Sequence, residues 1–363
     1  MAEFRQLSGK RRVYNLLRRE KTISRASLAQ MCELTRPAIS AIIDEMDSEG
    51  LVTEIGRGSS TGGKPPILLS LKPGARCAIG IDLGDDYLIR GVLCDAAGNI
   101  FAKESLEYSN NFASIVQTTL LLAGKLASFL PAKGTLTGAG IAVSGIVDPA
   151  LNEVVEGSSL DIVRKGLARS LEAELAYSVR LEKRPHAAAL AESLFGAGKG
   201  HDNLVYLTSG SGVGAGIVIA GEIFRGKSGA SGEIGGILLP DGRKLEESTR
   251  PSFLTSRYRE LTGKEVTFTE LAHAFRNKEE KALSLVLENA SFMAYAAASA
   301  ARFFDPEILV LGGTLLEFGE KYFAHFEGCF RQGGSSCLLA PSTFGAYGVA
   351  AGGAHIILDD LVK

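Results

Sequence analysis

Two stretches of the chain carry glycines at spacings that bind phosphate in other proteins. Residues 221–228 read G-x-x-x-x-G-K-S, the pattern of a loop that cradles phosphate at the start of a helix. Four more glycines follow by position 236, where no helix readily starts, so we interpret this match as a coincidence in a chain with 43 glycines. Residues 210–216, GSGVGAG, resemble a dinucleotide fingerprint but lie between two apolar runs, in the position of a hairpin. A nest of backbone amides and a purely structural tight hairpin both fit that stretch.

The residue types best suited to reading DNA lie near the N-terminus. Thr35, Arg36 and Ser40 bring two hydroxyls and a guanidinium to the start of an apolar run with helical spacing. Arg57 and Lys64 are cations in a glycine-rich stretch. Such side chains hydrogen-bond base edges in a major groove, and cations on a neighbouring loop contact phosphates or the minor groove. We therefore predict that these five residues contact DNA.

The elements around these residues fit that chemistry. Three short apolar runs with i, i+3, i+4 spacing predict amphipathic helices, the second capped by Ser24 and the third by Thr35, with Pro37 in its first turn. Residues 32–34 between them match the turn of a helix-turn-helix. Apolar strands on either side of the glycine-rich stretch form a wing. The pattern predicts a winged helix-turn-helix over residues 1–72, and a bundle with only a structural role is the alternative.

Charge and cysteine content bound the function further. Residues 1–72 carry 12 Lys/Arg against 8 Asp/Glu, whereas the remaining 291 carry 27 against 33, so a basic module precedes an acidic body. The 5 cysteines are odd in number and form no C-x-x-C pair, which argues against disulfides and thiolate metal sites. No apolar run approaches the ~18 residues that span a bilayer, and the N-terminus has no signal-peptide core. We expect a cytoplasmic protein without a membrane partner.

Beyond residue 72, an apolar strand, a glycine-containing turn and a returning strand occur twice. Strands alternate with helical stretches, a pattern that indicates an α/β body of two related lobes with a ligand cleft between them. The expected strands lie at 77–83, 91–93, 204–207 and 217–220, and the expected helices include 114–129 and 292–304.

Together these segments resemble the ROK family (repressor, open reading frame, kinase), in the branch of N-acetylglucosamine and xylose repressors, where a winged helix precedes a sugar-kinase-like body. The resemblance covers essentially the whole chain. It implies a two-lobed actin-like or hexokinase-like fold, with lobe 1 at 76–190 plus a C-terminal helix at 346–363, lobe 2 at 191–345, and a homodimer or homotetramer. The segments that carry it are SRASLAQMCELTRPAISAIIDEMDSEGLV, GGKPP, CAIGIDLG, VSGIVDP, AAALAE, TSGSGVGAGIV, SGEIGG, DPEILVLGG and GVAAGGA.

The same resemblance implies that catalysis has been lost. Family kinases take the sugar proton with an Asp in a Glu-Asn-Asp stretch, and the AAALAE segment aligns Arg184 with that Asp. A guanidinium accepts no proton at neutral pH, so we predict no catalytic residue and no cofactor. In the first phosphate loop, Asp85 and Asp86 add two carboxylates that repel a triphosphate. We interpret the remaining family residues as vestigial nucleotide loops: Asp82, Gly84, Thr208, Gly210, Ser211, Gly212, Gly312 and Gly313.

The family's zinc and sugar residues are partly kept. Gly236 stands where a zinc-ligand His is usual, and residues 240–244 replace the cysteine cluster, so we predict no metal. The predicted effector-binding residues are Ser159, Lys183, Arg184, Glu233 and Glu246. Carboxylates there hold sugar hydroxyls, and the two cations favour a phosphorylated or acidic sugar. The alternative is that Glu233 only pairs with Arg184 across an empty cleft.

These observations predict a repressor of carbohydrate metabolism that binds a double-stranded DNA operator. Its body is expected to be a catalytically inactive domain that dimerises and senses a sugar or sugar phosphate. The first alternative is a ROK-type carbohydrate kinase with an atypical active site. A second is a DNA-binding protein that responds to no effector.

Overall fold

The computed structural model describes residues 8–59, 65–239 and 241–362. The chain forms two compact units: Met1–Glu182 with Val349–Lys363, and Lys183–Gly348. The winged helix belongs to the same unit as the first lobe. The division falls between Glu182 and Lys183, whereas the boundary expected after residue 190 lies inside a helix.

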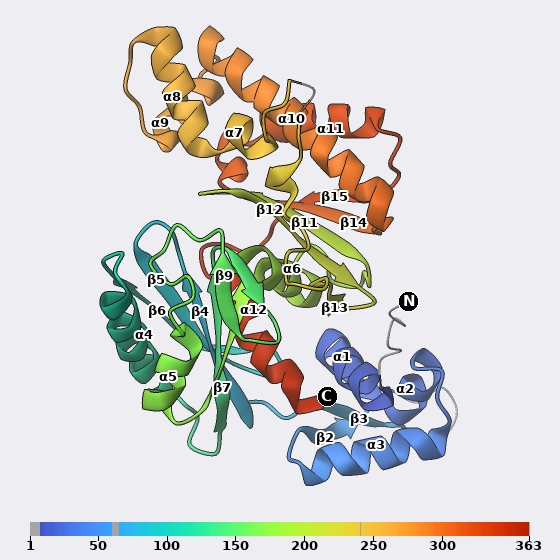
Figure 1. Ribbon diagram of the computed structural model, residues 1–363. Helices are drawn as coiled ribbons and strands as arrows, with labels where there is room; N and C mark the ends of the chain where they lie inside the picture. Colours follow the sequence, from blue (N-terminus) through green and yellow to red (C-terminus); the bar gives the residue numbers. More distant parts are fainter. Residues whose placement is uncertain (1–7, 60–64, 240, 363) are drawn as a thin grey trace. The chain divides into compact units, whose positions relative to one another are not determined.

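The N-terminal part of the first unit is a winged helix-turn-helix (Figure 1). Both predicted caps are confirmed, since the Ser24 hydroxyl accepts from Ser27 N at 3.1 Å and the Thr35 hydroxyl from Ala38 N at 3.3 Å. The three strands pair in the order β1-β3-β2, which places the wing beside the helices. The elements are α1 (Gly9–Glu20), β1 (Ile23–Ser24), α2 (Arg25–Met31), α3 (Arg36–Ser48), β2 (Val52–Arg57) and β3 (Ile67–Leu71).

The rest of the first unit is a five-stranded sheet in the order β10-β7-β4-β5-β6. β4 pairs antiparallel with β5 and parallel with β7, and α4 packs on β5 and β6. The elements are β4 (Arg76–Leu83), β5 (Leu88–Asp95), β6 (Ile100–Glu107), α4 (Phe112–Ala127), β7 (Thr135–Val143), β8 (Ile146–Asp148), β9 (Glu153–Glu156), α5 (Leu167–Leu175), β10 (Ser178–Lys183), α12 (Gly348–Leu358) and η3 (Asp359–Val362).

Two glycines let α12 pack unusually close to this sheet. A Cβ built on Gly80 of β4 would lie 1.8 Å from the Ala350 carbonyl oxygen, and one on Gly140 of β7 would lie 1.8 Å from that of Gly353. Any other residue at either strand position would collide with the helix backbone. The sheet therefore holds α12 in a slot that only glycine can line.

The second unit repeats the strand plan of the first, as the sequence predicted. Its sheet runs β13-β12-β11-β14-β15, with β11 antiparallel to β12 and parallel to β14. The elements are α6 (Arg184–Phe195), β11 (Leu204–Ser209), β12 (Val213–Ile219), β13 (Glu222–Ile223), η1 (Ile234–Gly236), α7 (Leu245–Thr249), α8 (Pro251–Thr262), α9 (Phe268–Arg276), α10 (Glu280–Phe304), β14 (Ile308–Gly313), η2 (Thr314–Phe318), α11 (Glu320–Gln332) and β15 (Leu338–Pro341).

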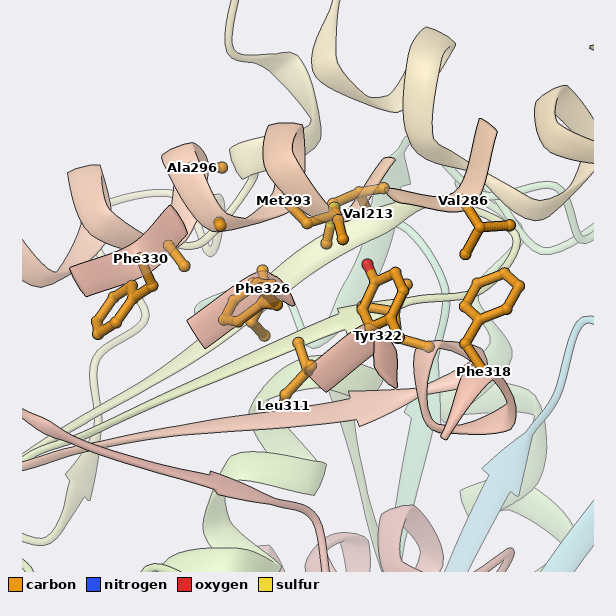
Figure 2. Packing of buried hydrophobic residues seen from close by; sticks show 14 of the residues in the cluster. Val213, Val286, Met293, Ala296, Leu311, Phe318, Tyr322, Phe326 and Phe330 are labelled. Carbon is orange, nitrogen blue, oxygen red and sulfur yellow. The ribbon is translucent and has the colours of Figure 1, made fainter. Parts of the chain in front are cut away.

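The core of the second unit lies between its sheet and the helices α10 and α11. Figure 2 shows Met293 of α10 and Phe326 of α11 among the buried apolar side chains. The buried Tyr322 hydroxyl donates to Asn289 Oδ1 at 2.8 Å, and Asn289 Nδ2 donates to Thr249 O at 2.9 Å, so both of these polar side chains have hydrogen-bond partners in the core. Among the described residues, no helix is long and apolar enough to cross a membrane.

Candidate functional site

The N-terminal half of α3 presents the residues predicted to read DNA. Thr35 and Arg36 are exposed and Ser40 is half-buried, while Ile39 and Ile43 on the opposite face are fully buried. The Thr35 hydroxyl accepts a bond from the helix backbone, but it still has a proton to donate. Arg36, at the helix start, is the one long cation among these three residues.

The C-terminal half of α3 is acidic, which sequence reasoning did not weigh. Asp44, Glu45 and Asp47 are exposed there, and phosphates would repel them. Two cations from other helices lie against this half. Arg25 of α2 contacts Asp44 at 4.0 Å and Glu54 of the wing strand at 3.2 Å. Because the C-terminal half of α3 carries exposed carboxylates that repel phosphate, we predict that the N-terminal half of the helix meets the DNA.

Lys10 of α1 is the second cation on this acidic half. Its ammonium lies 2.7 Å from Glu45 and 2.7 Å from Glu49. Arg25 and Lys10 were both missed as contributors to this surface. Their signal in the sequence is only a surplus of acidic residues on one helix, since the partners are 19 to 39 residues away.

The wing contributes Arg57, which is exposed at the end of β2. Lys64 lies outside the described residues. The positive charge of residues 1–72 is not all directed at a ligand, because Arg11 and Arg18 of this segment are buried. The charge count therefore overstates the number of cations available to DNA. Part of the positive charge of residues 1–72 lies inside the protein and does not reach the surface.

In the second unit, the stretch aligned with the kinase base starts helix α6. Lys183 is the residue before the helix and Arg184 is its first residue. The Lys183 side chain is 3% exposed and its ammonium forms an ion pair with the Glu233 carboxylate, besides donating to Ser231 O at 2.9 Å. The pair described for Glu233 is thus with Lys183, where the sequence had suggested Arg184. Glu233 remains 48% exposed in its side chain and can accept a further hydroxyl.

His186 on the same helix is held in one tautomer. Its Nε2 lies 3.1 Å from the Ser231 hydroxyl, whose own proton goes to Phe224 O. Because that oxygen can then only accept, His186 carries its proton on Nε2. His186 and Lys183 therefore both hydrogen-bond to Ser231 and help to hold its position. Glu233, two residues further on, is held near Lys183 in this way.

The glycine hairpin pairs with the strand β14 and has Glu246 beside its turn. Thr208 pairs with Gly312 in the sheet, and Gly210–Gly212 form the turn of the β11–β12 hairpin. A Cβ on Gly235 would lie 3.1 Å from Glu246 Oε2, and one on Gly212 would lie 3.9 Å from the same atom. Glu246 is thus adjacent to the hairpin predicted as a vestigial phosphate loop, and its carboxylate disfavours a phosphate there.

The glycines of β14 have structural causes of their own. A Cβ on Gly312 would meet the Tyr206 hydroxyl at 2.0 Å, and Gly313 has φ +72°. Burial raises the pKa of Tyr206 to about 12, with the carboxylate of Glu192 as a second cause. These packing requirements keep both glycines whether or not a nucleotide binds.

In the first unit, the acidic loop after β4 is built into the protein. Asp82 is buried, and the Asp86 carboxylate pairs with Arg90 at 2.5 Å. The Ser159 hydroxyl donates to Asp85 Oδ1 at 3.0 Å. A residue predicted to bind the effector thus lies against a carboxylate predicted to repel a triphosphate. The repulsion expected from both carboxylates is reduced for Asp86, because a guanidinium neutralises it.

Gly84 is closely surrounded in this loop. A Cβ there would lie 2.5 Å from Asp86 Oδ1. The Tyr108 hydroxyl donates to Gly84 O at 2.6 Å and fixes the loop on the sheet. Among the residues that the structure describes, no group of three or more His, Cys, Asp or Glu side chains could hold a metal ion.

Comparison with known proteins decides the family. The ROK family profile matches residues 78–332, and a winged helix-turn-helix DNA-binding profile matches residues 10–53. The chain belongs to the ROK family. Like the repressors of that family, it joins a DNA-binding winged helix to a ROK body.

Named ROK relatives match along almost the full chain. The xylose repressor of Bacillus subtilis (strain 168) is 27% identical over 354 residues, which cover 93% of this chain and 91% of that protein. The DNA-binding transcriptional dual regulator NagC of Escherichia coli (strain K12) is 25% identical over 88% of this chain and 83% of its own. In organisation and along almost its full length, the protein is thus similar to ROK proteins named as regulators of transcription.

Solved structures support the same fold. A ROK family transcriptional regulator, a homologue of the Escherichia coli MLC protein, superposes with a TM-score of 0.78 at 20% identity, over 96% of this chain and 95% of its own. A ROK hexokinase from Thermus thermophilus gives 0.70 at 25% identity, over 79% of this chain and 100% of its own. The second match lacks a counterpart for part of this chain, as expected where a winged helix precedes a kinase-like body.

Proposed function

We propose that this protein represses genes of carbohydrate metabolism by binding an operator as a homodimer or homotetramer, and that its ROK body senses a sugar without phosphorylating it. The observation that carries the proposal is the pairing of an exposed recognition-helix start, at Thr35, Arg36 and Ser40, with a kinase site whose base position holds Arg184. The first is suited to DNA, and the second is unsuited to proton abstraction.

The loss of catalysis is supported by the environment of α6. The base of a sugar kinase must accept a proton from a hydroxyl, and neither an ammonium nor a guanidinium can do so at neutral pH. Lys183 is buried, and its ammonium forms an ion pair with Glu233, so this carboxylate is already engaged.

Selection of DNA tests the first half of the proposal. The full chain is incubated with random duplexes, and bound sequences are amplified and aligned. We expect a pseudo-palindrome whose half-sites lie about one or two helical turns apart, ~34 Å per turn, because a two-fold dimer presents two recognition helices. Enrichment of no sequence, or of a single unrepeated half-site, would contradict the operator proposal.

A coupled assay of ADP release tests the second half. With ATP and a panel that includes D-xylose and N-acetylglucosamine, we expect no sugar-dependent turnover. Turnover at even ~1 s⁻¹, the low end of ordinary enzymes, would replace the proposal with the kinase alternative. That alternative is favoured by one observation, the structural match to a ROK hexokinase over 100% of that chain.

The effector is proposed to be a sugar with an anionic group. Arg184, which is half-buried at the start of α6 beside the Lys183–Glu233 ion pair, is the group proposed to attract the anion. Glu233 and Glu246 are the acceptors for sugar hydroxyls, and Ser159 is the proposed contact from the first unit. Guanidinium groups bind phosphate and carboxylate through charge-assisted hydrogen bonds.

Titration calorimetry compares D-xylose, N-acetylglucosamine, N-acetylglucosamine 6-phosphate and a uronic acid. We expect the anionic sugars to bind more tightly and Arg184→Ala to remove that preference. Lys199→Ala, an exposed cation of the same unit, is the matched control and should change nothing. A preference for neutral sugars that persists in Arg184→Ala would mean that this arginine only replaced the catalytic base.

A further inference from the structure

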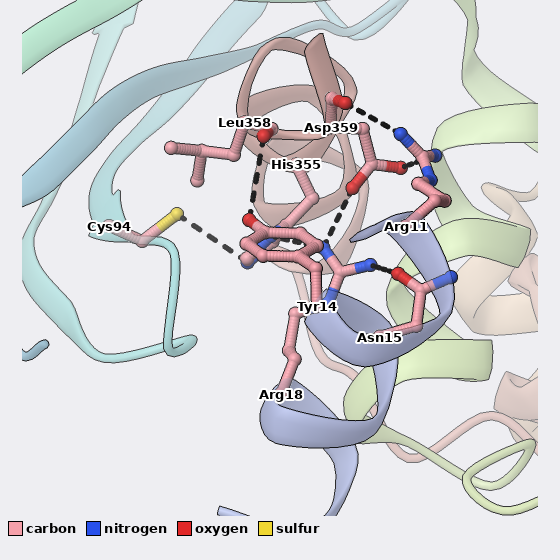
Figure 3. Close-up of polar contacts among 8 residues, drawn as sticks. All are labelled: Arg11, Tyr14, Asn15, Arg18, Cys94, His355, Leu358 and Asp359. Atoms are coloured by element: carbon pink, nitrogen blue, oxygen red, sulfur yellow. Dashed lines mark hydrogen bonds and ion pairs between the residues drawn. The ribbon is translucent and has the colours of Figure 1, made fainter. Parts of the chain in front are cut away.

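A cluster of charged and neutral polar side chains is buried where α1 of the winged helix meets the C-terminal end of α12. We name it the junction cluster: Arg11, Tyr14, Arg18, His355 and Asp359 (Figure 3). The Asp359 carboxylate receives Arg11 NH2 on Oδ2 at 2.7 Å and Arg18 NH1 on Oδ1 at 2.8 Å. Arg11 NH1 also donates to Asp359 O at 2.6 Å. The two arginines, seven residues apart on α1, thus converge on one carboxylate.

The other members of the junction cluster orient Arg18. Its guanidinium lies over the Tyr14 ring at 4.9 Å, and Tyr14 in turn donates to Leu358 O at 3.4 Å. Arg18 NH1 lies 3.3 Å from His355 Nδ1. An arginine can only donate, so His355 accepts on Nδ1 and carries its proton on Nε2, which faces Cys94 Sγ at 3.9 Å. Burial, with the nearby Arg18 charge, lowers the pKa of His355 to about 3, so the imidazole is neutral.

Asp359 is therefore the anion on which this junction depends. The Arg18 side chain is 1% exposed and that of Asp359 10% exposed, so neither charge is well hydrated. Burial alone would raise the pKa of Asp359, but Arg18 and Arg11 hold it below its usual range, and the carboxylate stays ionised. Removing one member of a buried ion pair leaves the other charge uncompensated, which is far costlier than losing a surface pair.

The covalent link between the winged helix and the first lobe is short and is bonded to the lobe through its backbone: Gly74 N donates to Asp95 Oδ2 at 2.8 Å, and Ala75 O accepts from Thr135 N at 2.9 Å. Four residues, 72–75, separate β3 from β4. Outside the junction cluster, Arg76 donates to Glu49 O at 2.7 Å and Lys21 donates to Ala97 O, both to backbone atoms. The buried ion pairs are thus the main side-chain attachment of α1 to the lobe in the described structure.

The helix that precedes Asp359, α12, leads from the second unit into the first. The second unit ends at Gly348, and the next residue, Val349, already belongs to the first. From there α12 runs through the glycine-lined slot to Leu358, and Asp359 follows directly. A helix held this tightly moves as a rigid element. Any displacement at its start reaches the carboxylate at its end.

We propose that Asp359 is the positioning residue that fixes the DNA-binding domain on the ROK body, so that α12 transmits the state of the body to α1. This inference rests on the proposed operator binding. It names Asp359 as the side chain through which the ROK body controls that binding. Two winged helices held at a set separation pay less entropy on binding two half-sites than two that move on flexible linkers.

The test compares Asp359→Asn with Asp360→Asn in the full chain. Asp360 is the adjacent acid, and its ion pair with Arg180, at 3.4 Å, is partly exposed. Hydrogen exchange is followed in α1 and, as an internal reference, in β4. Affinity is measured for the duplex that the wild-type chain selects. We expect Asp359→Asn to speed exchange in α1 at least tenfold with β4 unchanged, and to weaken duplex binding at least tenfold. Asp360→Asn should do neither.

Two results would overturn the proposal. One is unchanged α1 exchange in Asp359→Asn, and the other is faster α1 exchange with full duplex affinity. Should Asp359→Asn fail to fold, Arg11→Gln leaves Asp359 paired with Arg18 and is expected to shift both readouts in the same direction by a smaller factor; no shift in either would also overturn it. A wild-type chain that selects no duplex refutes the operator function itself. The exchange measurement on α1 still tests the role of the junction cluster in that case, so the two failures are distinguishable.

Discussion

Substituting alanine for Gly80 tests how tightly the sheet holds α12. The added Cβ would lie 1.8 Å from the Ala350 carbonyl oxygen and 2.6 Å from the Ala354 nitrogen, both backbone atoms that cannot rotate away. Since such contacts are essentially never shorter than 3.0 Å, the helix must retreat by about 1.2 Å. Gly140→Ala makes the same demand against Gly353 O, at 1.8 Å.

The cost follows from what α12 buries. Ala350, Ala354 and Leu358 are fully buried, and Ile357 is 2% exposed. A gap of 0.5–1 Å already forfeits about a quarter to a half of each dispersion contact. We therefore expect Gly80→Ala to lower the free energy of unfolding by about 3 kcal/mol or more, at the upper end for overpacked cores. Since the retreat carries Asp359 with it, α1 should lose protection from exchange as well.

Gly124→Ala is the matched control. Gly124 is exposed in the interior of α4, and a Cβ there meets nothing within 4 Å. Alanine should stabilise that helix by about 0.5–1 kcal/mol. Urea unfolding followed by far-ultraviolet circular dichroism measures both variants, because the chain has no tryptophan for fluorescence. The same sign of change in the two variants, or a loss below about 0.5 kcal/mol in Gly80→Ala, would refute the steric reasoning.

Three further predictions concern DNA, pH and metal. Arg36→Ala should reduce discrimination between base sequences by about 1–3 kcal/mol. Lys64→Ala should mainly reduce, by about 1, the slope of the logarithm of the binding constant against the logarithm of salt concentration. Gel-shift titrations across salt that show neither effect would place the DNA face elsewhere. His355 has a pKa of about 3 in the fold, below its ordinary 6.5, so the unfolded chain binds the proton first and stability falls as pH drops below 6.5. Between pH 7 and 5 this amounts to about 2 kcal/mol, which His355→Gln should abolish in urea unfolding, and equal pH slopes in both proteins would contradict it. Elemental analysis of untagged protein should find well under one zinc per chain, and a stoichiometric value would refute that.

The local signals in the sequence predicted the winged helix well. Caps at Ser24 and Thr35 and the periodic apolar residues act within a few positions of each other, so their structure follows from short-range chemistry. The paired strand plan of the two lobes was also predictable, since strands and glycine turns are local too. The resemblance to the ROK family supplied the order of the elements.

Pairings between distant residues were not predictable in the same way. Arg11 and Arg18 looked like part of a basic DNA-facing module, but their partner is 341 to 348 residues away. Glu233 was assigned a choice between a sugar and Arg184, and the ion pair described is with Lys183, one residue earlier. Charge counts and spacing contain no information on which long side chain reaches which carboxylate once the backbone has closed. The predicted effector residues that lie in separate units remain predictions.

The order of α12 in the chain also sets the course of biosynthesis. The winged helix leaves the ribosome early, and residues 183–348 complete a continuous folding unit before Asp359 is made. At 5–20 residues per second, roughly 17 to 70 s separate the synthesis of the α1 arginines and of their carboxylate partner, which is 341 to 348 residues away. During that interval the slot beside Gly80 and Gly140 is empty, and two arginines destined for burial remain in water. The domain that is synthesised first is therefore the one whose ion pairs form last, and a chain that ends before Asp359 carries a winged helix without this attachment to the body.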